Sequence, residues 1–89
     1  KTMYKLTYSK TAIKQFSKLD RQTQILLQKW LKKNLENCTD PRLHGKPLTT
    51  DRSGQWRYRI GKYRIITDIL DQELIILVLE IGHRREIYE

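Results

Sequence analysis

The sequence lacks the features that mark secreted, membrane-spanning and metal-binding proteins. Its 89 residues include a single cysteine, Cys38, so no internal disulfide can form, and we expect the protein in a reducing cytoplasm. No apolar run reaches transmembrane length, and the N-terminus has no signal-peptide core, so we expect no membrane association. Cys38, His44 and His83 do not have a zinc-binding spacing, and no glycine-rich run resembles a phosphate-binding loop. We therefore expect no metal ion and no cofactor.

Acidic residues are also scarce relative to basic ones. Ten Asp and Glu stand against eighteen Lys and Arg, which gives a formal net charge of +8. This excess favours a polyanionic partner, with nucleic acid ahead of a membrane. Eight of the ten lysines lie in residues 1–41, and seven of the eight arginines lie in residues 42–89. Because arginine grips phosphate with a fixed fork of donors, the second half of the chain is expected to carry the function.

The hydrophobic pattern predicts one α+β domain over residues 1–89. Helical spacing indicates two consecutive helices, over about ten residues after Ser9 and over about 21–36, with Ser9 and Asp20 as their N-caps. Alternation predicts four strands, over residues 3–8, 55–60, 63–70 and 73–81. The order β-α-α-β-β-β is typical of a helical hairpin packed on one face of an antiparallel sheet.

Connections and core positions follow from the same pattern. Gly61-Lys62 and Asp71-Gln72 are predicted as tight turns, and residues 37–53 as a loop. The Ile/Leu/Val-rich strand 73–81 is predicted to form the buried centre of the sheet. The apolar residues expected to face the core from the two helices are Ala12, Ile13, Phe16, Leu19, Ile25, Leu26, Trp30, Leu31 and Leu35.

Three arginines are predicted to converge on the face of the sheet that the helices leave open. Arg57 and Arg59 are two residues apart in one strand and share a face, while the apolar Trp56, Tyr58 and Ile60 point the other way. Arg64 lies across the predicted hairpin turn, in register to join them. Like charges placed side by side repel one another, so such a cluster is more often kept for an anion than for stability. Asp68 shares this face and is expected to balance an arginine.

The C-terminal segment adds groups suited to RNA chemistry. His83 has a side chain whose ordinary pKa, about 6.5, suits proton transfer, and Tyr88 offers an aromatic face for base stacking. The alternatives are a hydrogen-bonded histidine at a strand end and a tyrosine at the edge of the core. Cutting RNA requires deprotonation of the 2′-OH, stabilisation of the phosphorane and protonation of the leaving oxygen. Arginines suit the second task and are poor bases.

The chain resembles the RelE toxins of the RelE/ParE superfamily. The likeness covers nearly all of it and lies mainly in three segments: residues 16–20 (Phe-Ser-Lys-Leu-Asp), residues 54–64 (Gly-Gln-Trp-Arg-Tyr-Arg-Ile-Gly-Lys-Tyr-Arg) and residues 82–88 (Gly-His-Arg-Arg-Glu-Ile-Tyr). The resemblance implies a type II toxin that cleaves mRNA in the ribosomal A site. It also implies a cognate antitoxin, with operator DNA bound only through the toxin–antitoxin complex.

The resemblance also implies roles for single residues. Arg57 and Arg59 match basic positions that are lysines in several members, Arg64 matches a phosphate-contacting arginine, Arg84 matches an arginine that stabilises the transition state or leaving group, and Tyr88 matches a base-stacking tyrosine. His83 stands where it could take over proton transfer, and the assignment of base and acid is open. Lys10, Lys14 and Lys18 are expected to face ribosomal RNA unless they form only a solvated helix face. The remaining residues expected to bind RNA are Lys46, Lys62 and Arg85.

Two other functions fit the same fold. A ParE-like toxin poisons DNA gyrase and is expected to lack the arginine and tyrosine set that this sequence retains. A non-catalytic module could bind RNA or act as a corepressor with its antitoxin. A free ribonuclease is a further option, but the absence of a strong base favours dependence on the ribosome for substrate orientation.

Overall fold

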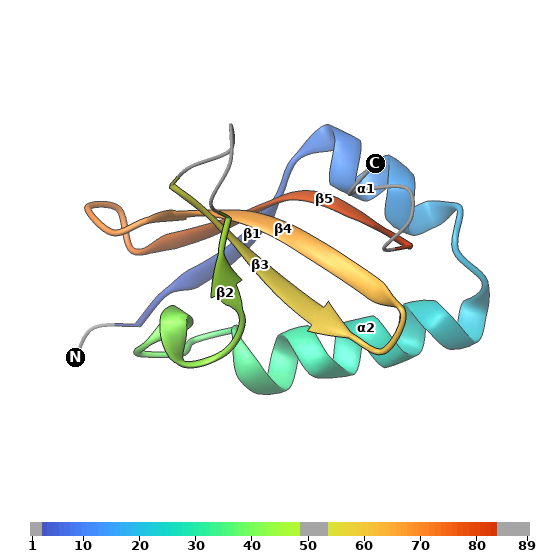
Figure 1. Cartoon of the computed structure of the whole chain (residues 1–89), viewed down its shortest axis with the longest axis horizontal. Coiled ribbons are helices and arrows are strands. Elements are labelled where there is room, and N and C mark those ends of the chain that lie inside the picture. Colours follow the sequence, from blue (N-terminus) through green and yellow to red (C-terminus); the bar gives the residue numbers. More distant parts are fainter. Residues whose placement is uncertain (1–2, 49–53, 84–89) are drawn as a thin grey trace.

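The computed structural model describes residues 3–48 and 54–83, and it shows two helices packed on a five-stranded mixed sheet (Figure 1). The predicted α+β class, with a helical hairpin against a sheet, is confirmed. The strands are ordered β1-β5-β4-β3-β2 in space. Along the chain the elements are β1 (Lys5–Tyr8), α1 (Lys10–Ser17), α2 (Arg21–Asn34), a 3₁₀ turn (Pro41–Leu43), β2 (Lys46–Pro47), β3 (Gln55–Ile60), β4 (Tyr63–Leu70) and β5 (Ile75–His83).

Both predicted helix N-caps are confirmed. The Ala12 N–H donates to Ser9 Oγ at 3.0 Å, and the Thr23 N–H donates to Asp20 Oδ2 at 3.3 Å. Each bond satisfies one of the amides that a first helical turn leaves without an intrahelical partner. Asp20 also separates the two helices, because its extended backbone (ψ 162°) interrupts the helical path.

The helix residues that face the sheet differ in part from those that the sequence predicted. Leu27, Leu31 and Leu35 are at most 1% exposed and form the face of α2 that meets the sheet. Ile25 and Leu26 were predicted to face the core, and this is wrong, because they are 42% and 51% exposed. Successive helical residues are rotated by about 100°, so both lie well off the stripe of Leu27 and Leu31.

The shorter helix α1 shows the same effect. Ala12 is fully buried and Phe16 and Leu19 pack against the core, as predicted. Ile13, in contrast, was predicted to be buried and is 57% exposed. Only the line through Ala12 and Phe16, four residues apart, faces the sheet.

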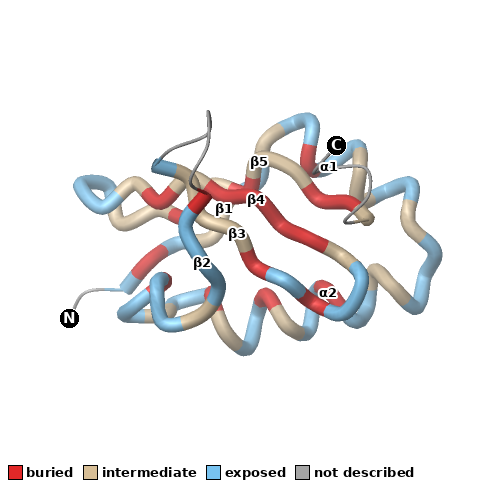
Figure 2. The backbone as a smooth tube through the Cα atoms, viewed as in Figure 1, coloured by how far each residue is buried: buried red, intermediate tan, exposed pale blue. Residues whose placement is uncertain are grey.

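The sheet differs from the prediction in its pairing. β1 runs parallel to β5, so the sheet is mixed rather than wholly antiparallel. β4 occupies the centre, between β5 and β3, and carries a near-continuous run of buried positions (Figure 2). The strand predicted as the centre is β5, which lies one place off it. A two-residue strand, β2, pairs with β3 inside the predicted loop.

The two hairpin connections also differ. The Gly61-Lys62 turn is confirmed, and Gly61 has the positive φ (61°) that a two-residue hairpin turn requires at its first position. The second connection spans Asp71–Leu74 instead of two residues, and β5 starts at Ile75 rather than Glu73. Leu74 adopts φ 57°, a left-handed conformation that is uncommon for a leucine.

A β-bulge interrupts β5 opposite Ile66 and Thr67 of β4. Ile66 pairs with Glu80 and Thr67 pairs with Val78, so Leu79 is an extra residue in the strand. β1 pairs with β5 only as far as Val78, and beyond that point side chains of α1 and its N-cap form hydrogen bonds to the backbone of β5. Ser9 Oγ donates to the Leu79 carbonyl at 2.9 Å, and the Ile81 N–H donates to Gln15 Oε1 at 2.7 Å. The helix therefore satisfies the backbone on both sides of the irregularity.

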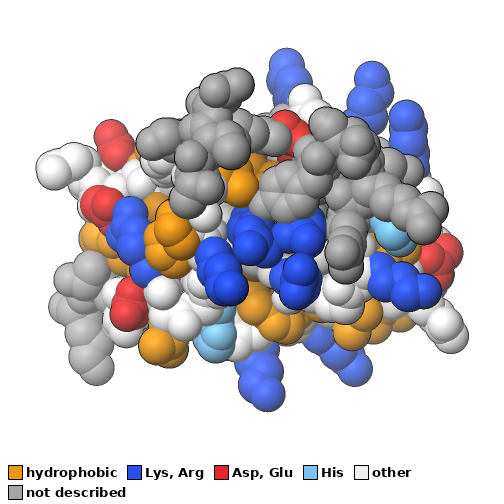
Figure 3. All heavy atoms as spheres, in the orientation of Figure 1, with side chains coloured by type: hydrophobic (Ala, Val, Ile, Leu, Met, Phe, Trp, Pro, Cys, Tyr) orange, Lys and Arg blue, Asp and Glu red, His pale blue; other side chains and the backbone are white. Residues whose placement is uncertain are grey.

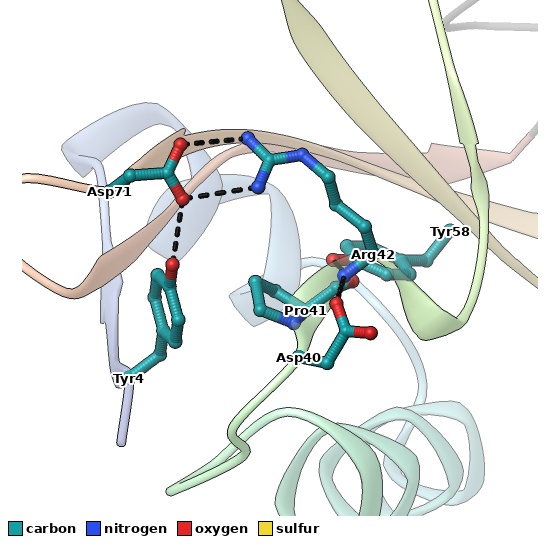
Figure 4. Close-up of polar contacts among 6 residues, drawn as sticks. All are labelled: Tyr4, Asp40, Pro41, Arg42, Tyr58 and Asp71. Atoms are coloured by element: carbon teal, nitrogen blue, oxygen red, sulfur yellow. Dashed lines mark hydrogen bonds and ion pairs between the residues drawn. The ribbon is translucent and has the colours of Figure 1, made fainter. Parts of the chain in front are cut away.

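Three distant segments meet at Asp71, in the loop between β4 and β5 (Figure 4). The guanidinium of Arg42 donates to both carboxylate oxygens, at 3.1 and 3.0 Å, and Tyr4 Oη donates to Oδ1 at 2.7 Å. The hydrogen bond from Arg42, followed by that from Tyr4, lowers the pKa of Asp71. Asp71 and Arg42 are about half exposed, so this cluster contributes modestly to stability while fixing the segment before β2.

Removing this carboxylate should change the acid sensitivity of the fold. A lowered pKa in the folded state stabilises the protein above the unfolded pKa of about 3.9, and the contribution disappears as the pH falls through the folded value. We expect Asp71→Asn to melt below the wild type by a constant margin from pH 5 to 7, and that margin to shrink below about pH 4. Thermal melts across pH test this, with Glu73→Gln in the same loop as the control. A margin that stays the same at pH 2 would contradict the expectation.

Candidate functional site

The register of the sheet brings the three predicted arginines together on the face opposite the helices. Arg59 of β3 pairs directly with Arg64 of β4, and Arg57 pairs with Ile66 one step along. Directly opposed residues have Cβ atoms about 4.5–5.5 Å apart on the same face. Tyr58 and Ile60, on the other side of β3, are buried in the core. The predicted division of β3 into an arginine face and a core face is thus found in the structure.

The three arginines differ in how far they are enclosed. Arg64 is only 6% exposed, Arg57 is half-buried and Arg59 is exposed. On its other side, Arg64 is opposite Gly82 of β5, which has no side chain. In Figure 3 the basic side chains gather over the middle of this face. The cluster therefore combines a buried guanidinium, that of Arg64, with a solvent-exposed one, that of Arg59.

A pocket of about 240 Å³ lies at the edge of this cluster. Among the described residues, Gly45, Lys46, Arg57 and Arg59 line it, and three of these four carry a positive charge. Lys46 reaches the site because β2 pairs it with Arg57. A hollow lined by lysine and arginine is electrostatically suited to a phosphate group. We name the set Lys46, Arg57, Arg59 and Arg64 the basic face.

Gly45 is part of the site and was not singled out from the sequence. It adopts φ 78°, and a Cβ placed on it would come within 2.9 Å of both Trp56 Nε1 and Tyr58 Cδ1. Only glycine allows the loop to approach β3 this closely. A lone Gly after a histidine in a loop gives no sequence signal of such a contact, because the contact partners lie more than ten residues away.

Aromatic side chains on the core face of β3 hold this loop in place. Tyr58 Oη donates to the Pro41 carbonyl at 2.6 Å, and Trp56 Nε1 donates to the His44 carbonyl at 2.6 Å. Trp30 of α2 packs against both His44 and Tyr58, with ring centroids 5.9 and 5.5 Å apart. Burial raises the pKa of the Tyr58 phenol, so it remains a proton donor to the loop. The aromatic contacts therefore fix Gly45 and Lys46 against the basic face.

The structure does not bring His83 together with the arginines. His83 pairs with Tyr63, and their rings make an edge-on contact with centroids 5.7 Å apart. Tyr63 packs against the core, so this pair lies on the helix side of the sheet. The side chain of His83 therefore points to the helix side of β5, whereas Gly82, which pairs with Arg64, lies on the arginine side. Its proposed part in proton transfer would require a route around the strand end.

The remaining predicted site residues fall into two groups. Lys10 and Lys14 are exposed on α1 and line a shallow hollow of about 520 Å³, and Lys18 is exposed at the C-cap of that helix. Lys62 is exposed in the β3–β4 turn. α1 packs along β5, while the basic face is built on β2, β3 and β4. The lysines of α1 are therefore a separate surface. Arg84, Arg85 and Tyr88 lie outside the described residues.

Within the described residues, two carboxylates share the open face with the arginines. Asp68 was expected there, and it pairs with Gln55 of β3. Glu80 was not expected, because regular alternation from the buried Val78 would turn it into the core. The bulge at Leu79 places it opposite Ile66 instead, in the same row as Arg57. Nothing in the sequence marks the bulge, so this residue could be found only from the structure.

The side chains of the described residues do not assemble a metal centre. Across residues 3–48 and 54–83, no three His, Cys, Asp or Glu side chains come close enough to hold a metal ion. Within the same ranges, no helix has the length and apolar character needed to span a bilayer. Burial raises the pKa of the Cys38 thiol, which makes it a poor nucleophile.

Comparison with known families identifies the chain. A family model described as the ParE toxin of the type II toxin–antitoxin system parDE matches residues 6–88, nearly the whole sequence. The chain belongs to the ParE toxin family. This places it among the type II toxins of the RelE/ParE superfamily, as the sequence resemblance implied.

Individual relatives of this ParE-family toxin are named RelE or RelG. It is 35% identical over 49 residues to the toxin RelG of Mycobacterium tuberculosis, an alignment that spans 55% of this chain and 56% of RelG, so the match covers about half of the relative's length. A chain of the RelBE2 toxin–antitoxin complex from M. tuberculosis superposes with a TM-score of 0.83 and 25% identity over 93% of both chains. The isolated RelE toxin of E. coli superposes with a TM-score of 0.72 and 22% identity, covering 90% of this chain and 83% of RelE, which shows a common fold.

Proposed function

We propose that this toxin is an endoribonuclease that cleaves mRNA in the ribosomal A site. The observation that carries the proposal is the basic face, where Arg57, Arg59 and Arg64 converge beside a pocket that Lys46 completes. A toxin that acted only by covering a partner protein would have no need to crowd like charges in this way, since opposed like charges destabilise a sheet. The relatives named RelE and RelG favour the same function.

The chemistry assigned to this face is stabilisation of the phosphorane. Guanidinium donors fixed in the sheet would meet the equatorial oxygens of the scissile phosphate, where negative charge accumulates in the transition state. Arg64 is the best anchored of the three because it is almost fully enclosed. The donor set favours attack by the 2′-OH of the substrate rather than a metal-bound water, since guanidinium groups line the pocket and do not ligate metals. Arg84 and Tyr88 are proposed to complete the site by transition-state stabilisation and base stacking.

The proposal includes a protein partner that keeps the toxin inactive. Solved complexes of similar proteins pair RelE with RelB in E. coli and in Pyrococcus horikoshii. We propose a cognate antitoxin for this chain as well, with an acidic segment suited to a net charge of +8. Lys10, Lys14 and Lys18 are proposed to contact ribosomal RNA while the basic face engages the message.

Mapping of mRNA 5′ ends by primer extension tests the proposed function. The protein is added to a translating extract and, separately, to the same message without ribosomes. We expect cuts positioned by codon only in the presence of ribosomes, and about 10²-fold slower cutting by Arg59→Gln, which removes one phosphate donor from an exposed position. Arg21→Gln on α2 removes the same charge away from the basic face and should cut at the wild-type rate.

The alternatives give different results in the same experiment. Cuts in naked RNA would make the toxin a free ribonuclease. The family model carries the name of ParE, so gyrase poisoning is the second candidate. It would be supported by a lack of cleavage with and without ribosomes, combined with inhibition of DNA supercoiling by gyrase in a purified assay.

A further inference from the structure

The position of Glu80 depends on the bulge in β5. Val78 and Ile81 are both buried, at 0% and 1% exposed, although they are three residues apart. In a regular strand, residues three apart point to opposite faces. The extra residue, Leu79, absorbs the difference, so Val78 and Ile81 both face the helices and Glu80 lies on the same side of the sheet as the basic face. Bulges that re-aim a side chain in this way are frequent next to active sites.

The backbone around Glu80 is held on both sides. Ser9, which caps α1, donates from its Oγ to the Leu79 carbonyl, and Gln15 of the same helix accepts from the Ile81 N–H. These hydrogen bonds lie along the edge of β5 that β1 no longer covers, since the last pair between the two strands is Tyr8 with Val78. Glu80 therefore projects from a stretch of chain that is fixed by side chains of α1, the kind of support that an exactingly placed catalytic group needs.

Glu80 is the carboxylate closest in register to the centre of the basic face. Arg59, Arg64 and Gly82 lie side by side across β3, β4 and β5, and Glu80 is two residues before Gly82 in β5. Glu80 is therefore the diagonal neighbour of Arg64 on the same face. Diagonal neighbours lie about 7–8 Å apart, within reach of long side chains. Asp68 is one step further from that row. Glu80 is half-buried, and across Ile66 it shares its own row with Arg57.

We propose that Glu80 is the general base of the cleavage reaction, an inference that rests on the proposed function. A guanidinium stays protonated and cannot accept a proton, and His83 faces the other side of β5. The Glu80 carboxylate takes the proton of the 2′-OH as that oxygen bonds to phosphorus. The bond from phosphorus to the 5′-oxygen breaks, and the leaving oxygen takes a proton from water. The hydroxide that remains takes the proton that Glu80 had accepted, which restores both the water and the carboxylate. The products are a 2′,3′-cyclic phosphate and a 5′-hydroxyl, with no net consumption of water.

Substitution of Glu80 by Gln tests the inference, because it keeps the shape and removes the basic oxygen. In the ribosome-dependent assay we expect cleavage at saturating ribosomes to slow by roughly 10²–10⁴-fold, with the ribosome concentration for half-maximal rate unchanged. Glu80→Asp should recover part of the rate, since it restores the base at a greater distance. Glu73→Gln, in the exposed β4–β5 loop, is the matched control and should cut as the wild type does. Thermal melts establish that each variant is folded.

The pH dependence separates a base from a residue that only positions Arg64. The charged groups of the described chain that share the face of Glu80 are Lys46 from β2, Arg57 and Arg59 from β3, and Arg64 and Asp68 from β4. α1, which packs against β5, adds the exposed Lys10 and Lys14 on a separate surface. With a carboxylate base, the wild-type rate falls on the acid side as the base is protonated, and Glu80→Gln loses that limb. If Glu80→Gln slows cleavage but keeps the limb, the inference is wrong.

The two proposals fail in different ways. A wild-type toxin that makes no cuts with or without ribosomes overturns the proposed function, and the inference falls with it. A wild type that cuts, beside a Glu80→Gln variant that cuts equally fast, overturns the inference alone and leaves the nuclease activity in place.

Discussion

Replacing Gly45 by alanine is expected to lower the melting temperature of the toxin by roughly 10–30 °C, through two costs that add. The backbone is left-handed at this position (φ 78°), which costs an L-residue about 1–2 kcal/mol. The new methyl would also press on Trp56 Nε1 and Tyr58 Cδ1, each 2.9 Å away, and on the carbonyl oxygen of Arg57. Overpacking of this kind costs about 1–3 kcal/mol, and the rigid β3 backbone leaves little room for relief.

Gly61→Ala is the matched control for this prediction. Gly61 also has a positive φ (61°), but nothing lies within 4 Å of the Cβ that alanine would add. The control therefore carries the backbone cost of about 1–2 kcal/mol without the steric one. Thermal and urea unfolding of both variants measure the difference. If Gly45→Ala melts no lower than Gly61→Ala, the steric cost expected from the close approach of the loop to β3 is absent, and the prediction is wrong.

Replacing Arg64 by lysine is expected to slow mRNA cleavage by about 10²–10³-fold although the charge is kept. Arg64 is 6% exposed and lies directly between Arg59 on one side and Gly82 on the other. From that seat a planar guanidinium can offer two parallel donors to a phosphate, whereas an ammonium offers a single point of contact on a flexible stem. The loss should appear in the rate at saturating ribosomes, because the transition state gains most from the fork.

The control for the arginine prediction is Arg42→Lys. Arg42 also makes a bidentate contact, with Asp71, but it lies over the Trp56 ring on the side of the loop rather than on the basic face. Its replacement should leave cleavage unchanged and lower stability slightly, because the pair is half exposed. Cleavage by Arg64→Lys at the wild-type rate would show that the site needs only positive charge there.

Local patterns in the sequence determined most of the framework. Ser9 and Asp20 identify both helix starts because a capping side chain bonds to amides only three residues away. Gly61 identifies the β3–β4 hairpin, and the two-residue period of β3 then assigns Arg57 and Arg59 to one face and Tyr58 and Ile60 to the other. These features depend only on neighbours in the chain, so a short stretch of sequence is enough to predict each of them.

Features that depend on distant partners could not be predicted in this way. Leu27 rather than Ile25 faces the core because the line along which α2 meets the sheet is set by the packing of both elements. The parallel pairing of β1 with β5 joins segments about seventy residues apart, and no local period reports it. The apolar residues of an amphipathic helix therefore do not by themselves determine which of them the fold buries.

The features of the candidate site also divide into those set by local sequence and those set by distant contacts. The sequence by itself determined that the chain is a basic α+β protein with arginines on the open face of a hairpin, because alternation and turn chemistry act over a few residues. Only the tertiary structure decided that Gly45 and Lys46 close a pocket against those arginines, that His83 faces away from them, and that Glu80 faces toward them. For His83 and Glu80 the reason is that one extra residue in β5 reverses the alternation that follows it, and its position is fixed by bonds to α1. For Gly45 and Lys46 the reason is that their partners in β3 lie more than ten residues away along the chain.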